Sequence, residues 1–337
     1  MGHYLLGHGG SGDHSCEDRV RGICRVLPER PELYSGRLEE DWRYGLGAVA
    51  GLRRYTPGGP EHQIGPGDWC VTARPEAADK LRRGVRSVLW GWTPGKESLS
   101  RRSVRKLSRF QAVIVPDQES VEILRSAGLE NNVRLGPDPA FLVERQIRPL
   151  GGAFRQDTVG LCLSPAVCRF EPVEGLLYRS YCHLIRWILD NTPWQIALIP
   201  YCVQSACNDE LFLTALHRQF DESGRIARRE DCDCRGLRGD LSLCRCCVGT
   251  GGALAGWSCG VPGMCIGASA RALSLARTLF ASDREIVVGV GSLKREEELT
   301  NRFRAFLKQE DVLRRRLTAS VAQYRQWAAE WRWDSIA

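Results

Sequence analysis

The chain has 337 residues, of which 43% are hydrophobic and 26% charged, so it is long enough for two packed globular domains. Its net charge of +7 suits anionic small molecules or glycans, but it is too small and too dispersed to indicate nucleic acid. No run of about 18 apolar residues occurs, so no transmembrane segment is expected.

The start of the chain and its cysteines favour the cytoplasm. Residues 1–12 lack the basic segment of a secretory signal and turn glycine-rich early. The 15 cysteines are odd in number and spread through hydrophobic runs, which indicates reduced thiols. Five cluster between Cys232 and Cys247 as C-x-C and C-x-C-C, whereas zinc ligand pairs are usually separated by about two to four residues. Ordinary thiols and no metal site are therefore expected.

The first part of the chain reads as a strand, a glycine turn and a helix. The apolar run His3–Leu6 predicts a strand, Gly7–Asp13 a tight turn, and Cys16–Leu27 a helix. This order is the opening unit of a doubly wound sheet. The stretch from Pro28 to Pro60 is interrupted by prolines and glycines and is expected to be rich in loops.

Strands and helices then alternate at short intervals. Ser87–Gly91 and Ala112–Val115 predict strands, and helices are expected from Glu97 to Phe110 and from Gln118 to Ala127. Basic residues recur at helical spacing in the first of these helices, a pattern more typical of a solvated face than of a binding surface. The alternation predicts a parallel sheet.

The pattern restarts after a connection, Leu142–Asp157, that contains proline, glycine and mixed charges. The elements expected beyond it are strands at 158–163, 195–200, 246–249, 263–267 and 285–289, and helices at 177–191, 209–220 and 270–280. A last helix is expected from Glu296 to Trp331, with a break near Gln309. The sequence thus predicts an α/β protein with two Rossmann-like domains facing a cleft, residues 1–145 and 155–300, and a C-terminal helix, 301–337, packing back on the first domain.

Two turns carry groups suited to anions. The N–H groups of the glycine turn could hold an anion at the start of a helix, with His8, Asp13, His14 and Glu17 as flanking acid–base groups, or the turn could be purely structural. The turn Gly267–Arg271 joins a strand to a helix and offers a hydroxyl, a cation and helix N–H groups. The alternative for it is a serine cap beside a solvated arginine.

Several segments, in order, resemble the polysaccharide pyruvyl transferase family. His8–Glu17 is similar to its glycine-rich N-terminal motif, Gly65–Cys70 to its Gly-Gly-Asp-Asn-Tyr stretch, and Asp138–Phe141 to its junction motif. Further similar segments are Val88–Gly91, Glu119-Ser120, Leu237–Arg245, Gly260–Pro262 and residues between Gly267 and Phe280. The resemblance spans roughly residues 3 to 305.

The resemblance implies a glycosyltransferase-B-like fold and transfer of a pyruvyl group from phosphoenolpyruvate to a sugar diol. The product is a cyclic ketal on a bacterial cell-surface polysaccharide precursor, made in the cytoplasm. The donor and a saccharide acceptor are the implied partners, without a cofactor, and peripheral contact with a membrane-linked glycan is compatible with them. The sequence does not indicate the oligomeric state.

The same resemblance assigns residues to three roles. The second domain would bind the donor through Gly249, Gly267, Ser269 and Arg271. The first domain would bind the acceptor through His8, Gly9, Gly10 and Asp68. Catalytic acid–base groups would be His14, Glu17 and Glu119.

One run of four residues and three single positions depart from the family pattern. Thr250–Ala253 stands where the family has Ala-Arg-Thr-His, and Tyr201 where it has a histidine after Ile-Pro. Gln118 replaces an arginine, and Ala268 replaces a tyrosine. Two alternatives therefore stay open: a non-catalytic homologue that binds glycan or donor, and a nucleotide-sugar glycosyltransferase on the same fold.

Overall fold

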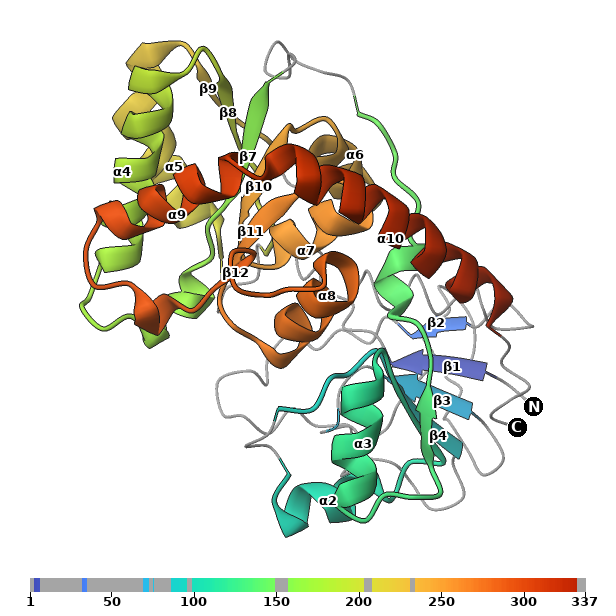
Figure 1. Cartoon of the computed structure of the whole chain (residues 1–337). Coiled ribbons are helices and arrows are strands. Elements are labelled where there is room, and N and C mark those ends of the chain that lie inside the picture. The colour runs from blue at the N-terminus through green and yellow to red at the C-terminus, as the bar shows by residue number, and fades with distance from the viewer. Residues whose placement is uncertain are drawn as a thin grey trace, which may run out of the picture. The chain divides into compact units, whose positions relative to one another are not determined.

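The computed structural model describes residues 3–6, 32–34, 69–72, 75, 86–95, 99–148, 157–202, 208–230 and 234–331. The chain divides into two compact units (Figure 1). Unit 1 holds most residues up to Val143 together with Tyr324–Ala337, and unit 2 holds Glu144–Gln323. Each unit is built on one six-stranded parallel sheet.

The sheet of unit 1 has the order β2-β1-β3-β4-β5-β6. Its strands are β1 (His3–Leu6), β2 (Glu32–Tyr34), β3 (Trp69–Thr72), β4 (Arg86–Trp90), β5 (Ala112–Val115) and β6 (Val133–Leu135). All neighbouring strands run parallel. The strand order reverses between β1 and β3, as in doubly wound sheets.

Two capped helices follow β4 and β5 in unit 1. The helix α2 (Arg101–Leu107) begins at Ser100, whose Oγ accepts the N–H of Ser103. The helix α3 (Gln118–Ser126) begins at Asp117, which accepts the N–H of Ser120 at 2.8 Å. The apolar sides of both helices share one core with β4 and β5.

The last described residues of the chain, around Tyr324 and Trp331, belong to the core of unit 1. The Trp331 ring lies 4.6 Å from that of Trp90, and its Nε1 donates to the Leu135 carbonyl. The Tyr324 hydroxyl accepts the backbone N–H of the buried Asp138, at 2.6 Å. These contacts attach the last turns of the C-terminal helix to the sheet of unit 1.

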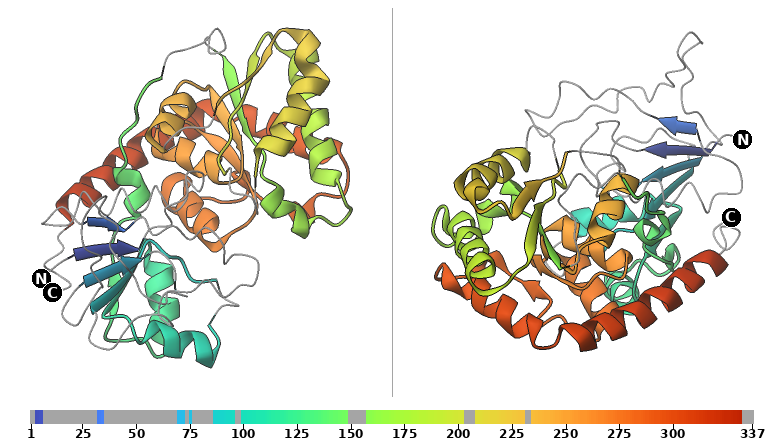
Figure 2. Two further views of the ribbon diagram at one scale, coloured as in Figure 1. Left: turned by 180° about the vertical axis from the view of Figure 1, so that it is seen from behind. Right: turned by 90° about the horizontal axis from the view of Figure 1, so that it is seen from above.

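The sheet of unit 2 has the order β12-β11-β10-β7-β8-β9, also parallel. Its strands are β7 (Thr158–Cys162), β8 (Gln195–Leu198), β9 (Ile226–Arg228), β10 (Cys246–Gly249), β11 (Gly263–Ile266) and β12 (Val287–Val288). Every residue of β7, β10 and β11 is buried, because helices cover both faces of the sheet (Figure 2).

The helices of unit 2 are α4 (Leu176–Asn191), α5 (Glu210–Phe220), α6 (Cys234–Ser242), α7 (Gly251–Ser258), α8 (Ala270–Phe280), α9 (Glu297–Leu307) and α10 (Glu310–Glu330). Aromatic packing joins α4 to α9, where the Trp187 and Phe303 rings are 6.1 Å apart. The expected break in the last long helix is confirmed at Lys308-Gln309.

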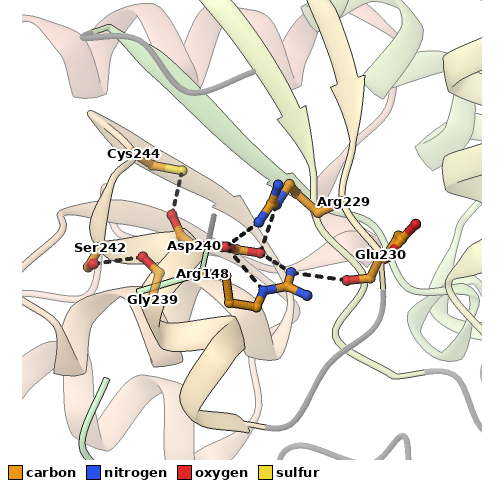
Figure 3. A network of polar contacts seen from close by, with 7 residues as sticks. All are labelled: Arg148, Arg229, Glu230, Gly239, Asp240, Ser242 and Cys244. Carbon is orange, nitrogen blue, oxygen red and sulfur yellow. Dashed lines mark hydrogen bonds and ion pairs between the residues drawn. The ribbon is translucent and has the colours of Figure 1, made fainter. Parts of the chain in front are cut away.

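The first segment of unit 2 is fixed to α6 by a buried carboxylate (Figure 3). Asp240 is fully buried and forms ion pairs with Arg148 and Arg229. Beside it, the N–H of Gln146 donates to the Arg235 carbonyl at 2.9 Å, and a Cβ atom on Gly239 would overlap the Gln146 carbonyl. Gly239 thus permits close contact between α6 and the segment around Gln146, and the ion pair of Asp240 with Arg148 stabilises this contact.

The predicted alternation of strands and helices is confirmed, with some differences. β2 lies inside the stretch expected to be loops, and β3, β9, α6 and α7 were not expected. β2 and β9 have three residues each, too few for a periodic signal, and α7 begins with two glycines. The helix predicted at Cys16–Leu27 lies outside the described residues.

The described cysteines lie in the interior or partly buried, and none forms a disulfide. Cys246 and Cys247 are buried in β10, as expected of core thiols. Within the described ranges, no group of His, Cys, Asp and Glu side chains is arranged to hold a metal ion. None of the described helices is long and apolar enough to cross a membrane.

Candidate functional site

The candidate site is the carboxyl edge of the sheet in unit 2. The strand order reverses between β7 and β10, so the segments that follow these two strands diverge there. In open α/β sheets, ligands bind at such a reversal, outside the carboxyl ends of the strands. The residues at this edge are Ser164 after β7, Tyr201 after β8, Thr250 after β10 and Gly267 after β11.

Gly249 lets β10 approach β7 at this edge. It pairs with Cys162, and a Cβ atom at position 249 would overlap the carbonyl oxygen of Cys162. The next N–H, that of Thr250, donates to the same carbonyl at 3.2 Å. Gly249 therefore has a packing role that needs no ligand.

The ring of Tyr201 packs against the first turn of α7. A Cβ atom on Gly251 would overlap this ring, and one on Gly252 would overlap the thiol of Cys162. Thr250, at the N-cap position, makes no side-chain capping bond. Glycine is thus required at positions 251 and 252, because the Tyr201 ring and the Cys162 thiol occupy the space that a side chain there would need.

Asp209 holds the backbone that carries Tyr201. Its buried carboxylate accepts the N–H groups of Tyr201 and Cys202, both at 2.9 Å. Its own N–H donates to the Cys202 carbonyl at 2.7 Å. This exchange joins the residues that follow β8 to the start of α5 and fixes the position of the tyrosine.

The turn into α8 presents hydrogen-bond donors and a cation. Gly267 has a φ of 109°, a conformation that glycine adopts at low cost. The exposed Ser269 is the N-cap, and its Oγ accepts the N–H of Ala272 at 3.1 Å. Arg271 lies half-buried in the first turn. The capping interpretation of Ser269 is correct, and the N–H groups of this helix start add to the arginine charge.

The interior side of this edge is lined by neutral groups. Burial raises the pKa of the Cys162 thiol well above its ordinary value, and burial raises that of Cys265 to about 12. Burial likewise raises the pKa of Tyr181, with further upward contributions from Cys162, Cys265 and Asp209. The Tyr181 hydroxyl is buried and has no hydrogen-bond partner among the described residues.

The pKa of Cys265 predicts a pH dependence of stability. The folded protein holds the thiol neutral up to about pH 12, against 9.0 for an ordinary thiol, so its contribution to stability is complete below pH 9 and is lost as pH rises toward 12. The difference in unfolding free energy between wild type and Cys265→Ala should therefore fall by about 1.4 kcal/mol per pH unit in this window. Urea unfolding of both proteins at about pH 8 and about pH 10.5 measures the fall, and a constant difference would contradict it.

The structure brings the four predicted donor-side residues, Gly249, Gly267, Ser269 and Arg271, to the ends of two adjacent strands. Glu119 lies in unit 1, exposed in the first turn of α3. The other predicted site residues, His8, Gly9, Gly10, His14, Glu17 and Asp68, lie outside the described residues.

Sequence reasoning missed Tyr181 and Asp209 at this edge, and it named Tyr201 only as a departure from the family's histidine. The only local signal for this arrangement was Asp209 at the start of a predicted helix. An aspartate there indicates a helix cap, not a hydrogen bond to the backbone of a preceding loop. The three residues come from separate segments that the sheet topology brings together.

Comparison with solved structures supports the fold. MnaA from S. aureus, in a structure with UDP, is 11% identical with a TM-score of 0.57, covering 94% of this chain and 90% of that one. A UDP-N-acetylglucosamine 2-epimerase is 13% identical, with a TM-score of 0.54 and the same coverage. HepE from Anabaena, in complex with UDP and glucose, is 12% identical with a TM-score of 0.50, covering 99% and 96%. The predicted glycosyltransferase-B-like fold class is thereby confirmed.

Comparison of the sequence gives the family. No curated protein matches the chain. The family model for polysaccharide pyruvyl transferase matches residues 58–245, more than half of the chain, from unit 1 through β7, β8 and α6 of unit 2. The matched range includes Tyr201 and Asp209 at the carboxyl edge. The chain belongs to the polysaccharide pyruvyl transferase family.

Proposed function

We propose that this protein transfers the pyruvyl group of phosphoenolpyruvate to a sugar diol of a cell-surface polysaccharide precursor. The observation that carries the proposal is the turn into α8, where Ser269, helix N–H groups and Arg271 adjoin at the carboxyl edge. A dianionic phosphate beside a carboxylate calls for such donors and such a cation.

The reaction requires two C–O bonds to form and one to break. The two diol oxygens add to C2 of the enolpyruvyl group, and the bond from C2 to the phosphate oxygen breaks. Of the two hydroxyl protons, one ends on C3, which becomes the methyl group, and the other leaves with phosphate or solvent. The protein must therefore supply a general acid for carbon, a general base for a hydroxyl, and stabilisation of the leaving phosphate.

The donor anion is assigned to unit 2. Arg271 pairs with the phosphate or carboxylate of the donor, and the first N–H groups of α8 add their partial positive charge. Gly267, with its φ of 109°, shapes the turn that carries these donors, and Gly249 keeps β10 close to β7 beside it. Burial of Tyr181 and the neighbouring thiols excludes competing charges from this edge.

The acid–base and acceptor roles are assigned to unit 1 by family resemblance. Glu119 is exposed at the start of α3 and can accept a proton. His14 and Glu17 complete the proposed acid–base set, and the acceptor contacts are His8, Gly9, Gly10 and Asp68. The proposed place of action is the cytoplasm of a bacterium, as the family resemblance implies.

Phosphate release tests the proposal. The protein is incubated with phosphoenolpyruvate and glycosides that carry free vicinal or 4,6-diols, and inorganic phosphate is measured. We expect release that requires an acceptor, together with a ketal product detected by mass spectrometry. Release without an acceptor, or no release with any diol, would contradict the transferase assignment.

A second candidate is a non-catalytic homologue that binds donor or glycan. It is favoured by the packing of Tyr201 against Gly251, which leaves no room at position 251 for the arginine of the family pattern. This candidate predicts binding of phosphoenolpyruvate without phosphate release. Binding of a nucleotide-sugar in place of phosphoenolpyruvate would instead favour a glycosyltransferase.

A further inference from the structure

A basic surface on α2 has no role in the proposed reaction. From Leu99 to Pro116 the sequence contains five cations and no carboxylate. Four of them are exposed and the fifth, Lys106, is partly buried. We call this set the α2 basic face; it consists of Arg101, Arg102, Arg105, Lys106 and Arg109.

The opposite side of α2 fixes this face toward solvent. Leu107 is buried in one core with Val113 and Leu124, and Val104 packs against the same core. Asn132 donates from its amide to the carbonyls of Leu107 and Phe110, at 3.1 and 3.0 Å, which closes the end of the helix. The helix is thus rigidly attached, and its arginines are displayed without being needed for packing.

Two charges of this face lie unfavourably in their own helix, whereas Arg105 and Lys106 lie favourably in its last turn. Arg101 and Arg102 lie in the first turn, which has no acidic residue, although the N-terminal end of a helix favours anions. The helices α9 and α10 carry acidic residues in their first turns, whereas α4 and α8, like α2, have none there. Residues that oppose local stability are expected where a function requires them.

Several exposed arginines of unit 2 are paired with carboxylates, and three arginines close together on α2 are not, among the described residues. Arg179, Arg228 and Arg277 form ion pairs with glutamate or aspartate at 2.8 to 2.9 Å. Within the part of the chain that the structure describes, Arg101, Arg102 and Arg105 have no carboxylate at ion-pair distance. No described carboxylate therefore neutralises the charge of these three arginines.

We propose that the α2 basic face binds the surface of an anionic phospholipid bilayer. A bilayer engages several neighbouring cations at once, each contributing to attraction within a Debye length, whereas a small anion engages one or two. Nucleic acid is disfavoured because Phe110, the aromatic residue beside this face, is buried and cannot stack on bases. The contact is peripheral and does not depend on the proposed reaction.

Vesicle binding tests this assignment. The full chain is sedimented with vesicles of equimolar phosphatidylglycerol and phosphatidylcholine, and with phosphatidylcholine alone. We expect binding to the anionic vesicles that weakens as salt is raised, and a fall of about 100-fold in the partition coefficient for Arg101→Gln/Arg102→Gln/Arg105→Gln.

A charge-matched control separates the face from the net charge. The variant Arg284→Gln/Arg302→Gln/Arg315→Gln removes three exposed arginines of unit 2 and should retain most of the binding. Equal losses in the two variants, no binding by the wild type, or binding to neutral vesicles that resists salt would overturn the proposal. Circular dichroism of each variant confirms folding. Phosphate release in solution should be unchanged by the α2 substitutions, so this test and that of the transferase can fail separately.

Discussion

Replacing Asp240 by asparagine should lower the unfolding free energy of unit 2 by about 3–5 kcal/mol, because the two arginines would lose the carboxylate that neutralises them. Asp240 is fully buried, and Arg229 donates to it through two nitrogens, at 2.9 and 3.0 Å. Arg148 donates to the same carboxylate and also to the Glu230 carbonyl (Figure 3). The asparagine keeps the shape but leaves two guanidinium groups close together. Urea unfolding followed by tryptophan fluorescence measures the loss.

The matched control is the exposed pair of Arg228 and Glu210. Their side chains are 38% and 26% exposed, so Glu210→Gln should cost less than about 1 kcal/mol. Similar losses for Asp240→Asn and Glu210→Gln would show that burial of the Asp240 pair contributes little. A large loss for Asp240→Asn alone would establish this network as the anchor of Glu144–Arg148 on α6.

Gly249→Ala should destabilise unit 2 by about 3 kcal/mol or more, even though it adds a single methyl group. The added Cβ atom overlaps a backbone oxygen of β7, which cannot rotate away as a side chain can. The strands β10 and β7 would have to separate at the centre of the sheet, with loss of ladder hydrogen bonds. Thermal and urea unfolding of the variant measure this effect.

Gly289→Ala provides the control, since Gly289 follows β12 at the same edge of the same sheet. Its φ of −68° suits alanine, and the nearest atom to an added Cβ, that of Ala268, is 3.8 Å away. This variant should be neutral or stabilising by up to about 1 kcal/mol. If Gly249→Ala were equally neutral, the close approach of β10 and β7 would not be required for the fold.

The elements that the sequence predicted well carry both a periodic pattern and an end signal. The helix α8 was predicted within its bounds because Ser269 caps it and apolar residues follow at helical spacing. The helix α7 was missed because two glycines begin it, and its position depends on the packing of Tyr201 and Cys162. Such contacts join residues distant in sequence and leave no local pattern.

The residues of the candidate site likewise divide into those that a local sequence pattern predicts and those that only the fold brings together. The donor-side turn could be recognised because a strand, a glycine, a serine and an arginine follow one another within a few residues. The carboxylate of Asp209 could not be assigned to Tyr201, because the bond depends on how the chain returns after β8. The ion pairs of Asp240 likewise join three segments that the sequence does not relate.

The central claim is that the carboxyl edge of unit 2 binds phosphoenolpyruvate through Arg271, and calorimetric titration of the donor tests it most directly. Arg271→Ala should weaken binding by about 10- to 100-fold, the usual effect of a charge-assisted hydrogen bond. Arg277→Ala, on the last turn of the same helix and paired with Asp283, should bind like the wild type. Donor binding that is lost in the first variant and kept in the second is the predicted result. Equal affinity in all three proteins, or no binding by the wild type, would contradict the account.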